Sequence, residues 1–195
     1  MQARSLVINT LLLDLTNAFL LLLERKHKYP ALLNMYSFID ICAALANDGE
    51  TNNRVIFERY VRGLPMMSGK PFSPYDLWAA RSALLHAYSP LGHHTAKSDA
   101  ARPIFYYSWP ERREEAEGVL RAKGYGGFIL LEVEDVKWVA IDALAWLQHR
   151  VETNAAFESR FLSNAQHFLF DLQSFKLESE LSLLEELDRK RRENA

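Results

Sequence analysis

The two residues of this chain best suited to chemistry are Arg81 and His86, which stand five positions apart in the segment 73–90. A guanidinium holds phosphate or carboxylate groups through several N–H donors, and an imidazole exchanges protons near neutral pH. Arg81 is surrounded in sequence by apolar residues, and burying an arginine is costly unless its charge is paired. It therefore needs a partner: a carboxylate such as Asp40 or Asp76, a second subunit, or a phosphate.

A single helix is predicted to carry both residues. Ser73 is a suitable N-cap, Pro74 suits the first helical position, and Asp76 stands where the acid of a capping box belongs. At 100° per residue, Arg81 lies inside an apolar arc about 120° wide. The other members of this arc are Leu77, Trp78, Leu84, Leu85 and Tyr88.

Composition restricts the class of protein. With 195 residues the chain is expected to form a single domain over 1–195, with a core at about 5–170. The 49% of hydrophobic and 25% of charged residues are ordinary for a soluble globular protein. A net charge of -2 excludes a global basic field, so nucleic-acid binding would need a local basic site. The single cysteine, Cys42, excludes an intrachain disulfide and agrees with the cytoplasmic location that we expect.

Helical patterns cover most of the chain. The first predicted helix, about 5–27, is apolar nearly all round, which predicts burial on more than one side, in the core or against a second subunit. Its leucine-rich run is interrupted by Asp14 and Asn17 and is shorter than the roughly 20 residues that span a bilayer, so no membrane segment is expected. Further helices are predicted at about 30–46, 52–63, 111–123, 135–170, either straight or kinked, and, as an amphipathic C-terminal helix, 177–192.

Two short segments rich in aromatic and β-branched residues, 103–109 and 127–133, are predicted to be strands. We expect them to pair as a small β-hairpin inserted into an otherwise helical bundle. The fold class is therefore predicted as mainly α with a small β-hairpin insertion.

The segment Arg81-Ser82-Ala83-Leu84-Leu85-His86 resembles the Arg-x4-6-His signature of HEPN domains, helical bundles that bind nucleotides or cleave RNA. The aromatic Trp78 before the arginine, the predicted hairpin after the motif and the acid-led helix from Glu134 add to the resemblance, which covers about 30–165. Ser82 stands where the family most often has Asn, Asp or His.

The resemblance implies a HEPN-like helical bundle that acts as a homodimeric, metal-independent endoribonuclease without a cofactor. His86 would serve as general acid or base, Arg81 would hold the phosphate, and Ser82 would orient either group or the substrate. On a straight helix, residues five apart point about 140° away from each other. Arg81 and His86 therefore converge only if the helix is distorted near 89–90 or if two copies meet across a dimer axis.

Four basic residues are candidates for an RNA-binding patch beside the motif: Arg54, Arg59, Arg62 and Lys70. The alternative is a solvated helix face, the usual role of such charges. The pair His93–His94 has no carboxylate or cysteine at ligand spacing, so no metal site is predicted.

Three functions are compatible with these patterns. The first is a toxin-like or defence-associated ribonuclease whose partner is RNA and an antitoxin or other protein. The second is a non-catalytic HEPN-like module that binds nucleotides or protein. The third is a helical interaction protein without a ligand, which the arginine on an apolar arc disfavours.

Overall fold

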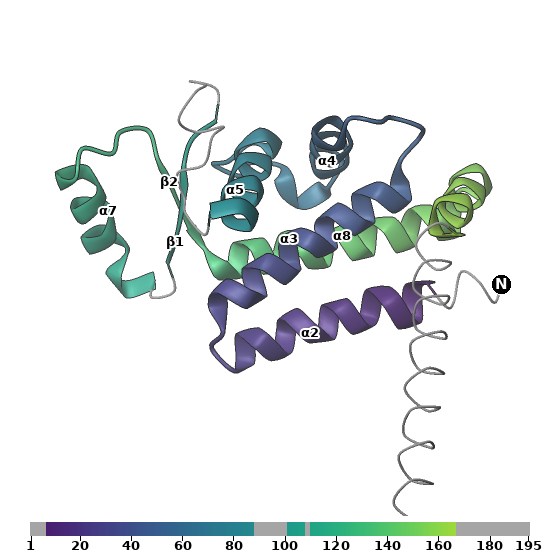
Figure 1. Cartoon of the computed structure of the whole chain (residues 1–195), viewed down its shortest axis with the longest axis horizontal. Helices are drawn as coiled ribbons and strands as arrows, with labels where there is room; N and C mark the ends of the chain where they lie inside the picture. Colours follow the sequence, from purple (N-terminus) through teal and green to yellow (C-terminus); the bar gives the residue numbers. More distant parts are fainter. Residues whose placement is uncertain (1–6, 88–100, 108–109, 167–195) are drawn as a thin grey trace, which may run out of the picture.

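A computed structural model describes residues 7–87, 101–107 and 110–166. Within these ranges the chain is mainly helical with one two-stranded sheet (Figure 1). The elements are η1 (Val7–Leu12, a π-helix), α2 (Leu13–Glu24), α3 (Lys28–Ala46), α4 (Asn53–Arg62), η2 (Pro65–Met67), α5 (Pro74–Ala87), β1 (Ile104–Tyr107), η3 (Pro110–Arg112), α7 (Arg113–Ala122), β2 (Ile129–Glu132) and α8 (Val133–Thr153). A further helix covers 155–166.

Helix α3 is the centre of the bundle. It packs against α2 on one side and against α8, α4 and α5 on the others (Figure 1). Nine of its residues are buried, among them Met35, Phe38 and Cys42. The Tyr60 hydroxyl of α4 donates a 2.6 Å hydrogen bond to the carbonyl of Ala143 in α8, which joins the two helices that flank this core.

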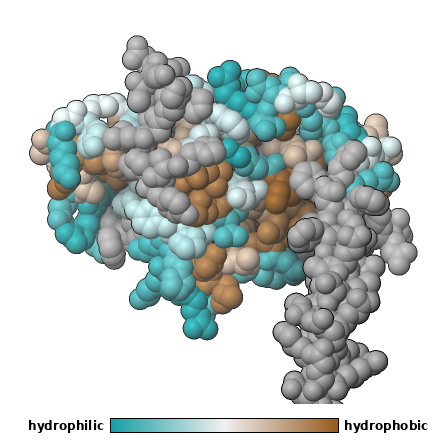
Figure 2. All heavy atoms as spheres, viewed as in Figure 1, coloured by the Kyte–Doolittle hydropathy of each residue, from teal (hydrophilic) through white to brown (hydrophobic). Residues whose placement is uncertain are grey.

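The N-terminal helices are less buried than their sequence predicts. Phe19 and Thr16 of α2 face the core, but Leu20 and Leu21 are 38% and 53% exposed. Figure 2 shows hydrophobic side chains at the lower edge of the molecule, where α2 lies in Figure 1. Within the described residues, the main packing partner of α2 is α3, and the expected burial of this helix on a further side, in the core or against a second subunit, stays a prediction.

Two stretches are long and apolar enough to cross a membrane by length and composition: Val7–Glu24, with a mean hydropathy of 1.6, and Lys28–Ala46, with 1.3. For α3 the packing explains this hydropathy, because half of the helix is buried inside the bundle. Core helices of soluble proteins are apolar for the same reason.

The predicted β-hairpin is wrong. Strands β1 and β2 pair in parallel, with Ile104 opposite Ile129 and Tyr107 opposite Glu132. The reason is the connection 108–128, which contains α7. Parallel strands require a crossover of a dozen residues or more, usually through a helix, whereas a hairpin needs only a short turn. The pair is therefore a small β-α-β unit at one end of the bundle (Figure 1).

The predicted helix 135–170 is divided in two. Helix α8 ends at Thr153, and Asn154 has an extended backbone with φ −138° and ψ 102°. The side chain of Asn154 accepts a 3.0 Å hydrogen bond from the Phe157 N–H, so this residue caps the next helix. The predicted helix 177–192 lies outside the described residues.

Helix α5 begins with the predicted capping box. The Ser73 N–H donates to Asp76 Oδ2 at 2.8 Å, and the Asp76 N–H donates to Ser73 Oγ at 3.1 Å. Asp76 also accepts hydrogen bonds from the main-chain N–H and the guanidinium of Arg102, each at 2.8 Å. This buried carboxylate therefore ties the start of α5 to the segment that leads into β1.

Candidate active site around Arg81

Arg81 forms an ion pair across two helices. Its Nε and Nη2 atoms lie 2.7 and 2.6 Å from the same oxygen, Oδ2, of Asp40 on α3. The guanidinium also lies over the ring of Trp78, 4.7 Å from the ring centroid. Of the two carboxylates that the sequence offers as partners, the structure selects Asp40, while Asp76 pairs with Arg102.

The ion pair sits at the edge of the bundle. The side chains of Arg81 and Asp40 retain 21% and 25% of their exposure. Both line a pocket of about 190 Å³, which is walled by α3 and α4. The other lining residues are Ile41, Ala43, Ala44, Asn53, Ile56 and Phe57. The pocket therefore combines one guanidinium and one carboxylate with an apolar wall.

Burial dominates the electrostatics of Asp40. Desolvation raises the pKa of this carboxyl above its ordinary value of 3.8, and the charge and hydrogen bond of Arg81 oppose the rise only in part. The charge and the hydrogen bond of Arg81 favour the charged form of Asp40 against this desolvation. In return, Asp40 holds the guanidinium in one position at the pocket.

His86 and Ser82 lie on α5 with Arg81. Ser82 is half-buried and is not among the residues that line the pocket. The backbone of His86 is helical, and its side chain is outside the described part of the structure. Because α5 runs as one α-helix to Ala87, Arg81 and His86 keep the angular offset of about 140° that the helical repeat imposes. A helix distortion near 89–90, one of the two ways in which Arg81 and His86 could converge, would lie outside the described residues.

All four candidate RNA-binding residues have carboxylate partners. Their N···O distances are 3.4 Å for Arg54–Glu58, 2.5 Å for Arg59–Asp48, 4.0 Å for Arg62–Glu58 and 3.0 Å for Lys70–Asp135. A phosphate would have to compete with these carboxylates. The ion pairs of Arg54, Arg59 and Arg62 on α4 agree with the alternative interpretation, a helix face that points to solvent.

One polar atom beside Arg81 has no hydrogen-bond partner in the described chain. The Nε1 atom of Trp78 is buried and unpaired, although indole N–H groups usually find an acceptor when they are buried. Within the same described residues, no group of three or more His, Cys, Asp or Glu side chains could hold a metal ion. Sequence reasoning had missed the pocket residues Asn53 and Phe57, since neither belongs to a recognisable motif.

No model of a known protein family matches the chain, and no curated protein and no solved structure matches it.

Proposed function

We propose that this chain is a HEPN-type, metal-independent endoribonuclease that acts as a homodimer in the cytoplasm. The observation that supports this proposal best is the position of Arg81. Asp40 holds its guanidinium in the lining of a pocket, and Arg81 lies on the same helix as His86. A guanidinium fixed before the substrate arrives stabilises the extra charge of a phosphorane-like transition state without a cost for reordering.

The reaction we propose is attack of an RNA 2′-oxygen on the adjacent phosphorus. The new P–O bond closes a 2′,3′-cyclic phosphate as the bond to the 5′-oxygen breaks. One proton leaves the 2′-hydroxyl and one reaches the departing 5′-oxygen. His86 performs one of these transfers, and Arg81 binds the phosphate oxygens. Asp40 is a positioning residue that acts through Arg81, and Ser82 orients the substrate or one of the two groups.

In the proposed dimer, Arg81 and His86 come together across the interface between two copies of the chain, since they do not converge within one helix. The exposed leucines of α2 offer one contact surface, but α2 lies on the opposite side of α3 from α5 (Figure 1). A composite site requires instead that the C-terminal ends of two α5 helices meet. Leu20→Lys should therefore leave RNA cleavage intact if the dimer forms through α5. Sedimentation at micromolar concentration should report twice the 22.5 kDa of one chain. A monomer would remove the composite site.

Cleavage of RNA in EDTA tests the enzyme proposal. Purified protein should cut single-stranded or loop RNA to products with 2′,3′-cyclic phosphates, while DNA survives because it lacks the 2′-hydroxyl. His86→Ala and Arg81→Ala should each lower the rate by about a hundredfold or more. Arg25→Ala is a matched control, because Arg25 is exposed, lies at the end of α2 and belongs to neither the motif nor the candidate RNA-binding patch.

The alternative function is a non-catalytic HEPN-like module that binds nucleotides or a protein. The observation in its favour is that Asp40 neutralises Arg81 and that every candidate RNA-binding cation is paired. Intact RNA in the presence of the wild-type protein would support this function against the enzyme.

A further inference from the structure

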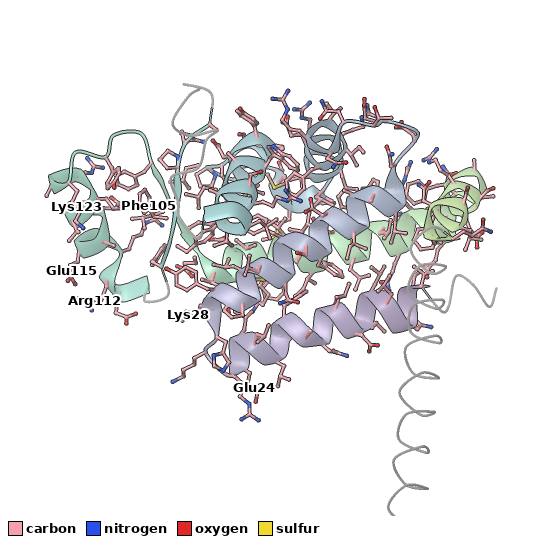
Figure 3. All side chains as sticks on the ribbon, viewed as in Figure 1. Glu24, Lys28, Phe105, Arg112, Glu115 and Lys123 are labelled. Carbon is pink, nitrogen blue, oxygen red and sulfur yellow. The ribbon has the colours of Figure 1, made fainter. Side chains whose placement is uncertain are left out.

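A second pocket, of about 370 Å³, lies between α7, the loop that leads into β2, and Arg102. It shares no residue with the pocket at Arg81. Figure 3 shows the surroundings: Phe105 points into the space between the sheet and α7, Lys123 lies at the far end of α7, and Arg112 and Glu115 lie at its start. The lining residues include three arginines, one glutamate, two aromatic residues and two glycines.

The charges of this pocket are incompletely balanced. Arg113, Glu117 and Arg121 follow one face of α7 at intervals of four residues, and all three line the pocket. Glu117 lies 3.3 Å from Arg113 and 3.8 Å from Arg121, so one carboxylate serves two guanidinium groups. Arg102, the third arginine, is matched by the buried Asp76. Among the α7 residues that line the pocket, two arginines therefore face one glutamate, although the whole helix also carries Glu114 and Glu115, which do not line it.

These two contacts are long for charge-assisted hydrogen bonds, which are about 2.7–2.9 Å. The neighbouring pair Arg112–Glu115, which does not line this pocket, shows the difference with a distance of 2.7 Å from Nε. Arg113 and Arg121 are 54% and 74% exposed, and each carries five N–H donors. Arg113 also interacts with the side chain of Tyr107, whose ring centroid lies 6.0 Å from its guanidinium, and Glu117 engages only part of the donor capacity of the two arginines.

The loop before β2 contains a glycine that the fold does not require. Gly127 has φ +64°, a conformation that favours glycine. Gly126 has no positive φ, and a Cβ at this position would meet no atom within 4 Å. No backbone hydrogen bond among the described residues uses the N–H of either glycine. A glycine without a conformational or packing reason is consistent with a ligand that approaches the main chain closely.

The remaining wall is aromatic. Tyr125 and Phe128 both line the pocket and pack against Phe105, with ring centroids 5.2 and 6.1 Å from it. We propose that this pocket binds a small dianionic phosphate monoester with a planar ring. Its phosphate would lie between Arg113, Arg121 and the N–H groups of the glycine loop, and its ring would lie on the aromatic wall. Glu117 occupies the two guanidinium groups until the phosphate displaces it.

Calorimetric titration of the full-length protein with phenyl phosphate, at pH 7.5 and low salt, tests this site. Arg113→Gln and Arg121→Gln should each weaken binding about tenfold, the scale of a lost hydrogen bond between charged groups. Glu117→Gln should tighten it, because the competing carboxylate is gone. Gly126→Ala should weaken binding while the melting temperature stays unchanged or rises. At pH 5 binding should weaken, since the second pKa of a phosphate monoester is about 6.

Arg112→Gln is the control, because it removes the same charge from the adjacent face of this segment. If Arg112→Gln and Arg121→Gln weaken the binding of phenyl phosphate equally, the effect comes from the net charge of the protein alone, and the proposed site is overturned. Absence of saturable binding would also overturn it, as would weaker binding by Glu117→Gln. Inorganic phosphate that binds as tightly as phenyl phosphate would refute the part played by the aromatic wall. RNA cleavage is not a readout, so failure here is independent of the proposed ribonuclease.

Discussion

Replacing Arg81 by alanine should destabilise the protein strongly at neutral pH. The substitution leaves the Asp40 carboxylate without its partner and removes the contact of the guanidinium with Trp78. Breaking a buried ion pair by removing one partner costs about 3–5 kcal/mol. Because the two side chains retain 21% and 25% exposure, we expect the low end, about 3 kcal/mol. For a chain of this length that loss lowers the melting temperature by about 6–12 °C.

The pH dependence of this loss separates the ion pair from simple packing. The pKa of Asp40 is raised in the folded protein, so the folded state holds this proton more tightly than the unfolded chain. Stability therefore falls as pH rises from the unfolded pKa of 3.8 through the raised pKa of the folded state, and then levels off. Without Arg81 the pKa of Asp40 rises further, and the fall is larger and extends to higher pH.

Thermal and urea unfolding of Arg81→Ala at pH 4.5 and pH 7.5 measure this effect. The variant should lose less stability at pH 4.5, where protonation makes the isolated carboxyl neutral. In an Asp40→Asn background, Arg81→Ala should cost nearly the same at both pH values. A loss in Arg81→Ala that does not change with pH, or a change in melting temperature below about 2 °C, would refute the account of the pair.

Three other predictions concern single residues. His86→Ala is expected to leave the melting temperature nearly unchanged while the rate of RNA cleavage falls. Thermal unfolding and a cleavage assay measure the two effects, and a large loss of both stability and activity would argue for a structural role of His86. Asp76→Ala should cost about 3 kcal/mol, because it leaves Arg102 and the capped start of α5 without their acceptor; the measurement is urea unfolding. Burial acts to raise the pKa of Asp76, but the hydrogen bonds from Arg102 and Ser73 outweigh it, so the pKa is lowered. The stability that the Asp76 carboxylate contributes should therefore be present above the unfolded pKa of 3.8 and be lost as pH falls through the folded value. Tyr36→Phe should cost about 1–2 kcal/mol in the same assay, because the Tyr106 hydroxyl, 2.6 Å from that of Tyr36, loses its partner, and no change would show that water replaces the bond.

Local patterns in the sequence were sufficient to predict most helices. The periodicity of apolar residues predicted helices at 30–46 and 52–63, and the structure places them at Lys28–Ala46 and Asn53–Arg62. The capping box of α5 and the stop of α7 near Gly124, which has φ +81°, also follow from neighbouring residues. Each of these features depends on interactions within one or two helical turns, which the order of residues determines directly.

The sequence by itself determined that Arg81 needs a partner, because the helical repeat places it among apolar residues whatever the rest of the chain does. Only the tertiary structure decided that the partner is Asp40, 41 positions away, rather than Asp76 on the same helix. It also decided that β1 and β2 run in parallel, that one face of α2 stays exposed, and that the arginines of α7 meet the glycine loop at a second pocket. These outcomes depend on how separate helices and strands pack against one another. A side chain that could pair equally well with several partners gives no indication in the sequence of which partner it contacts.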